Sequence, residues 1–254
     1  MLLVIQNILM VIQNYKKKLT FKYMKTLNDY FDKIVCINLD RRPDRWEESQ
    51  KEFEKLNIVV ERISALDGRF IKPPPGFKYP PGAFALLLTH IEIIKDAIKN
   101  NYKNFLLFED DVAFIDNFYE KFNAKIDFLP DDWDMFYLGG NHILHCGWGN
   151  FQMITGDKTF VPNKSNYKTL DYELCKTPWT QCAHAVAFNS KFYNDLLNQI
   201  QKYPGEAIDN IHFFSQRDGY NAYAFIPSLA IQRSSFSDIE NKHTFYAGSD
   251  LNSF

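Results

Sequence analysis

Cysteine is scarce in this sequence, and the few cysteines present form no recognisable pattern. They are Cys36, Cys146, Cys175 and Cys182, and no two of them have the C-x-x-C spacing of a structural zinc site. Cys36 lies within an apolar run, which is typical of a small core residue. We therefore expect four reduced thiols, as in a cytoplasmic protein, rather than a disulfide-linked secreted domain.

The sequence also lacks an excess of charge of either sign. Its formal net charge is -2 over 254 residues. Such a chain has no overall attraction for nucleic acid or for an anionic membrane, so we expect no nucleic-acid partner, and any nucleotide site must be local. Internal repeats and low-complexity tracts are missing too. The length suits one large α/β domain or two small ones.

A long uninterrupted hydrophobic run is missing as well. Residues 1–18 are largely apolar, but glutamine and asparagine interrupt them, and the run is short for a membrane span. They also lack the basic start and the cleavage site of a secretory signal. Three interpretations stay open: an amphipathic surface helix, a weak membrane anchor, or sequence upstream of a start at Met24. We predict a peripheral helical extension over 1–30 and one domain over 31–254, in the cytoplasm, with membrane contact only through 1–18.

What the sequence does contain is an alternation of apolar, β-branched runs with helical patterns. The expected strands are 33–39, 58–68, 105–108, 134–140 and 222–232, and the expected helices are 42–57, 83–100, 114–129 and 190–203. Residues 141–177 have no regular pattern. Alternation of this kind predicts the α/β class, with a mainly parallel central sheet and helices on both of its faces.

Two polar clusters follow predicted strands. Asn38 to Arg42 follow the first strand, and Glu109, Asp110 and Asp111 follow the apolar run 105–108. In a parallel sheet both clusters lie at the carboxyl ends of strands, where ligands bind. Clustered carboxylates suit Mg²⁺ or Mn²⁺. In extended backbone, Glu109 and Asp111 would point to one side and Asp110 to the other. The alternative interpretation is a solvated acidic turn.

A second acidic stretch, Asp132-Trp133-Asp134, precedes a predicted strand. Its carboxylates therefore belong to the amino end of that strand, away from the crevice, and suit turn and capping roles. The positive charges close to the crevice are Arg41, Arg42 and Arg45. Arginine pairs well with diphosphate and carboxylate groups, although a solvated helix face explains the same spacing.

Taken together, seven stretches of the chain resemble glycosyltransferase family 25, which includes bacterial lipooligosaccharide galactosyltransferases and collagen hydroxylysine galactosyltransferases. The stretches are INLDRRPDRW (37–46), ISALDG (63–68), GAFALLLTHIEII (82–94), LLFEDDV (106–112), WDMFYLGG (133–140), TQCAHAVAFNSKF (180–192) and the two parts of 207–239, AIDNIHFF and AYAFIPSLAIQRSSFSDI. They occur in the order of the family. The resemblance implies a GT-A type fold, a UDP-sugar donor and a Mn²⁺-like cofactor.

The resemblance also implies roles for particular residues. The residues carried over to the nucleotide-sugar donor are Asn38, Leu39, Arg41, Arg45, Ala65, Asp67, Thr89, His90, Glu109 and Asp110. The metal is implied at Asp111 and Glu109, with His243 as an extra ligand from a C-terminal segment that folds over the donor. His90 lies on an apolar helix, so a hydrogen-bonded core histidine is the alternative there.

The function that follows is an inverting transfer of a hexose, galactose or glucose, from a UDP-sugar to a hydroxyl of a glycan or protein acceptor. A divalent ion would stabilise the charge on the leaving diphosphate, and a base must take the acceptor proton. Asp209 matches a late acidic position of the family and is the expected base on the opposite face of the sugar, unless it caps the helix after it. Two alternatives stay open: a metal-dependent phosphohydrolase or nucleotidyltransferase, and a degenerate non-catalytic module.

Overall fold

The computed structural model describes residues 24–142, 151–154, 159–160, 172–177 and 179–244. Within these residues, nine strands form the main sheet, in the order β2-β1-β3-β9-β5-β10-β8-β6-β7. In chain order they are β1 (Lys33–Asn38), β2 (Glu61–Ser64), β3 (Asn104–Glu109), β5 (Met135–His142), β6 (Phe151–Met153), β7 (Thr159–Phe160), β8 (Glu173–Lys176), β9 (Thr180–Asn189) and β10 (Ala222–Ile226). Two short pairs lie beside the sheet: β4 (Val112–Phe114) with β11 (Ala230–Gln232), and β12 (Ser235–Ser237) with β13 (Lys242–Thr244).

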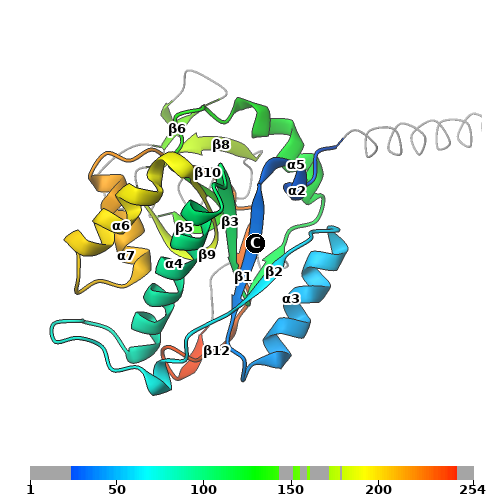
Figure 1. Cartoon of the computed structure of the whole chain (residues 1–254). Coiled ribbons are helices and arrows are strands. Elements are labelled where there is room, and N and C mark those ends of the chain that lie inside the picture. Colours follow the sequence, from blue (N-terminus) through cyan, green and yellow to red (C-terminus); the bar gives the residue numbers. More distant parts are fainter. Residues whose placement is uncertain (1–23, 143–150, 155–158, 161–171, 178, 245–254) are drawn as a thin grey trace, which may run out of the picture.

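Helices cover both faces of this sheet (Figure 1). The helices are α2 (Leu27–Tyr30), α3 (Pro43–Lys55), α4 (Pro81–Lys99), α5 (Phe118–Lys125), α6 (Tyr193–Lys202) and α7 (Ile208–Arg217), with short 3₁₀ turns at Gly68–Phe70, Ile126–Phe128 and Ser190–Phe192. Strand β1 shows why: Ile34 and Cys36 belong to one apolar core and Val35 and Ile37 to another. Side chains alternate between the faces of a strand, so both faces need a cover.

The sheet confirms the predicted α/β class, and its strand directions are mixed. β1, β2 and β3 are parallel, as are β5 and β10, whereas β9 runs antiparallel to both β3 and β5. β8 and β7 also run against their neighbours. The sequence pattern did not predict a strand over 180–189. That strand, β9, lies between β3 and β5 and runs antiparallel to both, so its amino end reaches the edge where β1 and β3 finish.

The expected boundary at residue 31 differs from the packing. Residues 1–23 lie outside the described part, and with them the predicted membrane contact through 1–18. Residues 24–30, however, belong to the domain: Leu27 is fully buried, and the Asn28 side chain exchanges two hydrogen bonds with the backbone of Val59, at 2.7 and 2.8 Å. The described residues include no helix long and apolar enough to cross a membrane.

Candidate active site

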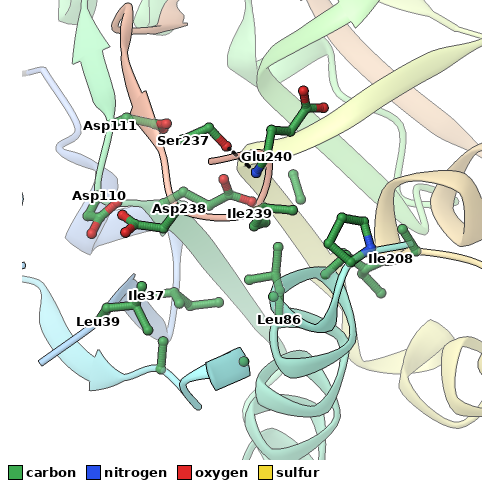
Figure 2. Close-up of a pocket in the computed structure, with 18 of the residues that line it drawn as sticks. Ile37, Leu39, Leu86, Asp110, Asp111, Ile208, Ser237, Asp238, Ile239 and Glu240 are labelled. Atoms are coloured by element: carbon green, nitrogen blue, oxygen red, sulfur yellow. Dashed lines mark hydrogen bonds between the residues drawn. The ribbon is translucent and has the colours of Figure 1, made fainter. Parts of the chain in front are cut away.

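A cleft of about 760 Å³ opens at the carboxyl ends of β1, β2 and β3. The starts of α3, α4, β9 and α7 also contribute to its walls, and the β12–β13 hairpin lies across it (Figure 2). The sequence assigned donor, metal or base roles to thirteen residues. Ten of them line this cleft: Asn38, Leu39, Arg41, Arg45, Ala65, Asp67, Glu109, Asp110, Asp111 and Asp209. The two polar clusters thus meet in one crevice, as predicted.

Parallel pairing of β1 with β3 brings the two clusters together. Ile37 pairs with Glu109, so the residues that follow them are neighbours. The Asn38 side chain donates a 2.6 Å hydrogen bond to Asp110 Oδ2 and accepts one of 2.8 Å from Arg62.

On the other wall of the cleft, the turn at Gly68 approaches the start of α4 so closely that a Cβ at Gly68 would lie 2.5 Å from the backbone nitrogen of Gly82. Only glycine fits there.

Arg45 is the positive partner of the acidic cluster. Its Nη2 lies 2.6 Å from Asp110 Oδ1 and 2.9 Å from Asp111 Oδ2, and all three side chains are nearly buried. Asp110 and Asp111 therefore face the same cation, and the prediction that they point to opposite sides is wrong. The reason is that β3 ends at Glu109, so Asp110 and Asp111 form a turn in which strand alternation no longer applies.

Asp111 presents one bonded and one free carboxylate oxygen. Its Oδ2 forms the ion pair with Arg45 and accepts a 3.0 Å hydrogen bond from Gln232 Nε2, whereas its Oδ1 is buried without a partner among the described residues. Gln232 reaches it because β11 pairs with β4, and Arg233 N–H holds the Asp111 carbonyl at 2.7 Å. A buried acceptor left unmatched costs about 1–3 kcal/mol.

Glu109 and Asp209 add further negative charge to the cleft. Burial raises the pKa of Glu109 well above its usual range, and the charges of Asp111 and Asp209 raise it further. Burial also raises the pKa of Asp209, to about 6, and its Oδ1 has no partner among the described residues. Asp209 does not cap α7, because the N-cap is Ala207. It lines the same cleft as Glu109.

Thr89 and His90 do not line the cleft. The Thr89 hydroxyl accepts a 3.1 Å hydrogen bond from the Leu66 amide and donates one to the Ala85 carbonyl, so it fixes the wall from behind. His90 is buried, its ring centroid lies 5.9 Å from that of His212, and burial lowers its pKa to about 3. His90 is therefore a neutral core histidine here.

His243 is exposed on β13, where its ring packs edge-on against Phe236, and it does not line the cleft. The structure does not bring it to the carboxylates. Within the described residues no three His, Cys, Asp or Glu side chains are arranged to hold a metal by themselves. The free Oδ1 of Asp111 with Glu109 beside it does fit a Mg²⁺-type ion that takes one or two carboxylates and completes its shell with water and substrate phosphate.

Among the cleft residues to which the sequence reasoning gave no primary role, three polar or titratable ones matter most: Gln232, Cys182 and Asp238. Gln232 lies on β11, which the sequence pattern did not separate from β10. Cys182 lies at the start of β9, which the pattern did not predict. Asp238 lies in the hairpin that follows β11, where a C-terminal cover was expected; the sequence offered this side chain only as a fallback base, with Glu206, should Asp209 not serve. The acidic stretch around Trp133 behaves as predicted: Asp132 and Asp134 bind Tyr223 and the Asn221 amide at the amino end of β5.

Comparison with known proteins gives sequence relatives in one family. Human procollagen galactosyltransferase 2 is 26% identical over 170 residues, 59% of this chain and 25% of that protein. A Bos taurus protein called probable inactive glycosyltransferase 25 family member 3 is 27% identical over 133 residues, 44% of this chain and 22% of that protein. The crystal structure of A197 from STIV has a TM-score of 0.41 at 12% identity, covering 85% of this chain and 94% of that one.

No family model matches the chain. The chain spans about a quarter of the length of the curated relatives it matches, and some of those relatives are named as inactive. The similarity nevertheless includes galactosyltransferase and glycosyltransferase 25 proteins alike. It confirms the resemblance that the motifs predicted, and the sheet with its covered faces is of the GT-A type: the chain is a GT-A-like α/β protein related in sequence to glycosyltransferase family 25.

Proposed function

We propose that this protein is a glycosyltransferase that moves a hexose from a UDP-sugar to an acceptor hydroxyl, with inversion and with help from Mn²⁺ or Mg²⁺. The observation that carries the proposal is the cleft itself. Glu109, Asp111 and Asp209 face it together, two of their oxygens lack partners among the described residues, and the one buried arginine, Arg45, bonds the neighbouring oxygens. Sequence similarity to a galactosyltransferase supports the same activity.

Asp111 and Glu109 are the residues that would hold the divalent ion. When bound, the ion would act as a Lewis acid that stabilises the negative charge on the departing diphosphate. Arg45 and Gln232 both bind Oδ2 of Asp111, which leaves Oδ1 aimed away from them. The chain thus orients a single oxygen for the ion before any ligand arrives, and preorganisation of this kind lowers the cost of reorganisation during the reaction.

Asp209 is our candidate for the base that accepts the proton of the attacking hydroxyl. Its pKa of about 6 is high for an aspartate and leaves it mostly ionised at neutral pH. The other acids that could serve are already paired: Glu206 with Lys78 and Tyr79, and Asp238 with Arg41 and Arg42. An acid held by a cation or donor is a poorer base than one whose oxygen is free.

The proposal is tested by measuring UDP release from a panel of UDP-sugars, with and without Mn²⁺ and with glycan or hydroxylysine acceptors. Metal-dependent UDP release that requires an acceptor would support it. Release of inorganic phosphate or pyrophosphate would instead support a phosphohydrolase or nucleotidyltransferase. Because some relatives are named inactive, a third outcome is also tested. Tight UDP-sugar binding with no turnover under any condition would identify a non-catalytic binding module.

A further inference from the structure

The Asp238 carboxylate lies between two guanidinium groups. Its Oδ1 pairs with Arg41 Nη1 and its Oδ2 with Arg42 Nη1, and the carboxylate side chain is only 14% exposed. Arg41 and Arg42 come from the turn after β1, whereas Asp238 comes from the hairpin almost 200 residues later. Two arginine forks that grip both oxygens of one anion form a specific anion-binding arrangement.

This arrangement lies at the edge of the cleft, because Arg42 is not among the residues that line it. Arg41 and Asp238 both line it, and Figure 2 shows the Asp238 side chain on the same side of the cleft as Asp110 and Leu39. Among the described residues, Arg45 also holds the hairpin there, with hydrogen bonds of 3.3 Å to the Phe236 carbonyl and 3.5 Å to the Ser235 hydroxyl. Ile239 packs against the start of α4 near Gly82. The hairpin therefore covers the carboxylate cluster while Asp238 stays bound.

The charges around this arrangement cancel. Arg41, Arg42 and Arg69 bring three positive charges, and Asp44, Asp67 and Asp238 bring three negative ones that pair with them. A diphosphate that enters beside a bound Asp238 would meet little net attraction, and it would find the Nη1 atoms of both arginines already engaged. Both obstacles disappear if the Asp238 carboxylate leaves, because the group then has one net positive charge and both Nη1 atoms lose their partner, while Arg41 keeps Asp67 and Arg42 keeps Asp44.

We propose that Arg41 and Arg42 form a binding slot for the diphosphate of a nucleotide, and that Asp238 fills this slot in the free protein. Diphosphate binding displaces the Asp238 carboxylate and frees the hairpin, so the cover over the cleft responds to the donor. The nucleotide identity rests on the proposed function, whereas the slot itself requires only a diphosphate group. Asp238 is thus an internal competitor of the donor.

The test measures the binding of UDP, uridine and inorganic pyrophosphate by calorimetry in the presence of Mg²⁺. We expect Asp238→Asn to bind pyrophosphate and UDP on the order of tenfold more tightly, because one charge-assisted competitor is lost. Uridine affinity should not change. Asp44→Asn is the matched control: it removes another carboxylate that pairs with Arg42, but Asp44 is exposed and outside the cleft, so affinities should stay within about twofold of wild type.

Two further measurements make the outcome decisive. Arg42→Gln should weaken pyrophosphate and UDP binding and leave uridine binding unchanged. Hydrogen exchange at 235–244 should rise in the wild type when pyrophosphate is added and should already be high in Asp238→Asn. If Asp238→Asn binds pyrophosphate no better than wild type, Asp238 is an anchor of the hairpin and the slot is refuted. Pyrophosphate binding with no transfer from any UDP-sugar would refute the proposed function alone.

Discussion

At the scale of single residues, the carboxylates of the cleft differ in how many hydrogen-bond or ion-pair partners they have. Asp110 has Asn38 and Arg45 as partners, whereas one oxygen of Asp111 and one of Asp209 have none among the described residues. Repulsion and burial raise the pKa of Glu109, and burial raises that of Asp209. Groups with perturbed pKa values concentrate at functional sites, because binding a cation or taking up a proton reduces the unfavourable energy of the buried, clustered negative charge.

We expect Asp111→Asn to abolish metal-dependent transfer and leave the fold intact. The amide keeps the shape of the side chain but removes the ligand charge, and Arg45 retains Asp110 as a partner. Mn²⁺ binding in the presence of UDP, followed by electron paramagnetic resonance, should be lost together with turnover. Asp116→Asn, an exposed neighbour outside the cleft, is the control and should behave as wild type. Wild-type turnover of Asp111→Asn at saturating Mn²⁺ would refute the metal assignment.

Asp209→Asn should slow transfer by at least ~100-fold without weakening UDP-sugar binding, because an amide cannot act as a base. It should also stabilise the metal-free protein. The folded pKa of about 6 lies above the unfolded value of about 3.9, so Asp209 stabilises the fold below pH ~4 and loses that contribution as the pH rises through 6. At pH 8 the variant should therefore gain roughly 1–3 kcal/mol, a difference that vanishes near pH 4.

Thermal unfolding at pH 8 and pH 4, together with single-turnover kinetics, checks both effects of Asp209→Asn. Asp195→Asn is the matched control, because Asp195 occupies the first turn of α6 as Asp209 does in α7. It should leave the rate of transfer unchanged. Turnover of Asp209→Asn within a few-fold of wild type would mean that the base lies elsewhere.

At the scale of elements, the sequence predicted the helices and the parallel strands well, and it missed the elements that complete the cleft. β1, β3 and α4 have long apolar patterns that predict a buried strand or a buried helix clearly. β9 contains Thr180, Gln181 and His184, so its polar start hid a buried ten-residue strand. β11 and β4 are three residues each, too short for a periodic signal, yet their pairing brings Gln232 to Asp111.

Helix α2 illustrates an element whose importance the pattern underestimates. It has four residues, yet Leu27 is fully buried in the core that contains Phe122. We expect Leu27→Ala to cost about 2–5 kcal/mol of unfolding free energy, as for other fully buried leucines. Urea unfolding measures this, and Asn28→Ala, which loses two exposed hydrogen bonds to Val59, should cost less. A loss below 0.5 kcal/mol for Leu27→Ala would contradict the packing of α2.

At the scale of the whole molecule, the domain begins earlier than its first strand. We expect deletion of residues 1–23 to leave a soluble, active protein, because Lys25 and Leu27, which the deletion keeps, already tie α2 to the domain. Melting temperature and UDP-sugar turnover of the truncated chain should match those of the full chain. Deletion of 1–30 is the informative comparison, since it removes Leu27 and should destabilise the domain. A large loss from the shorter deletion would show that 1–23 contributes to stability or activity.

The sequence by itself predicted the α/β class and the location of the cleft at the carboxyl ends of strands, because apolar runs decide which segments form buried strands and parallel strands present their carboxyl ends at one edge. The resemblance to glycosyltransferase family 25 predicted ten of the residues that line this cleft. Only the tertiary structure decided how the charges pair. Arg45 with Asp110 and Asp111, Gln232 with Asp111, and Asp238 with Arg41 and Arg42 all join segments between 65 and 197 positions apart. No local pattern encodes such contacts, because they depend on the pairing of β1 with β3 and on where β11 and the hairpin return to the sheet.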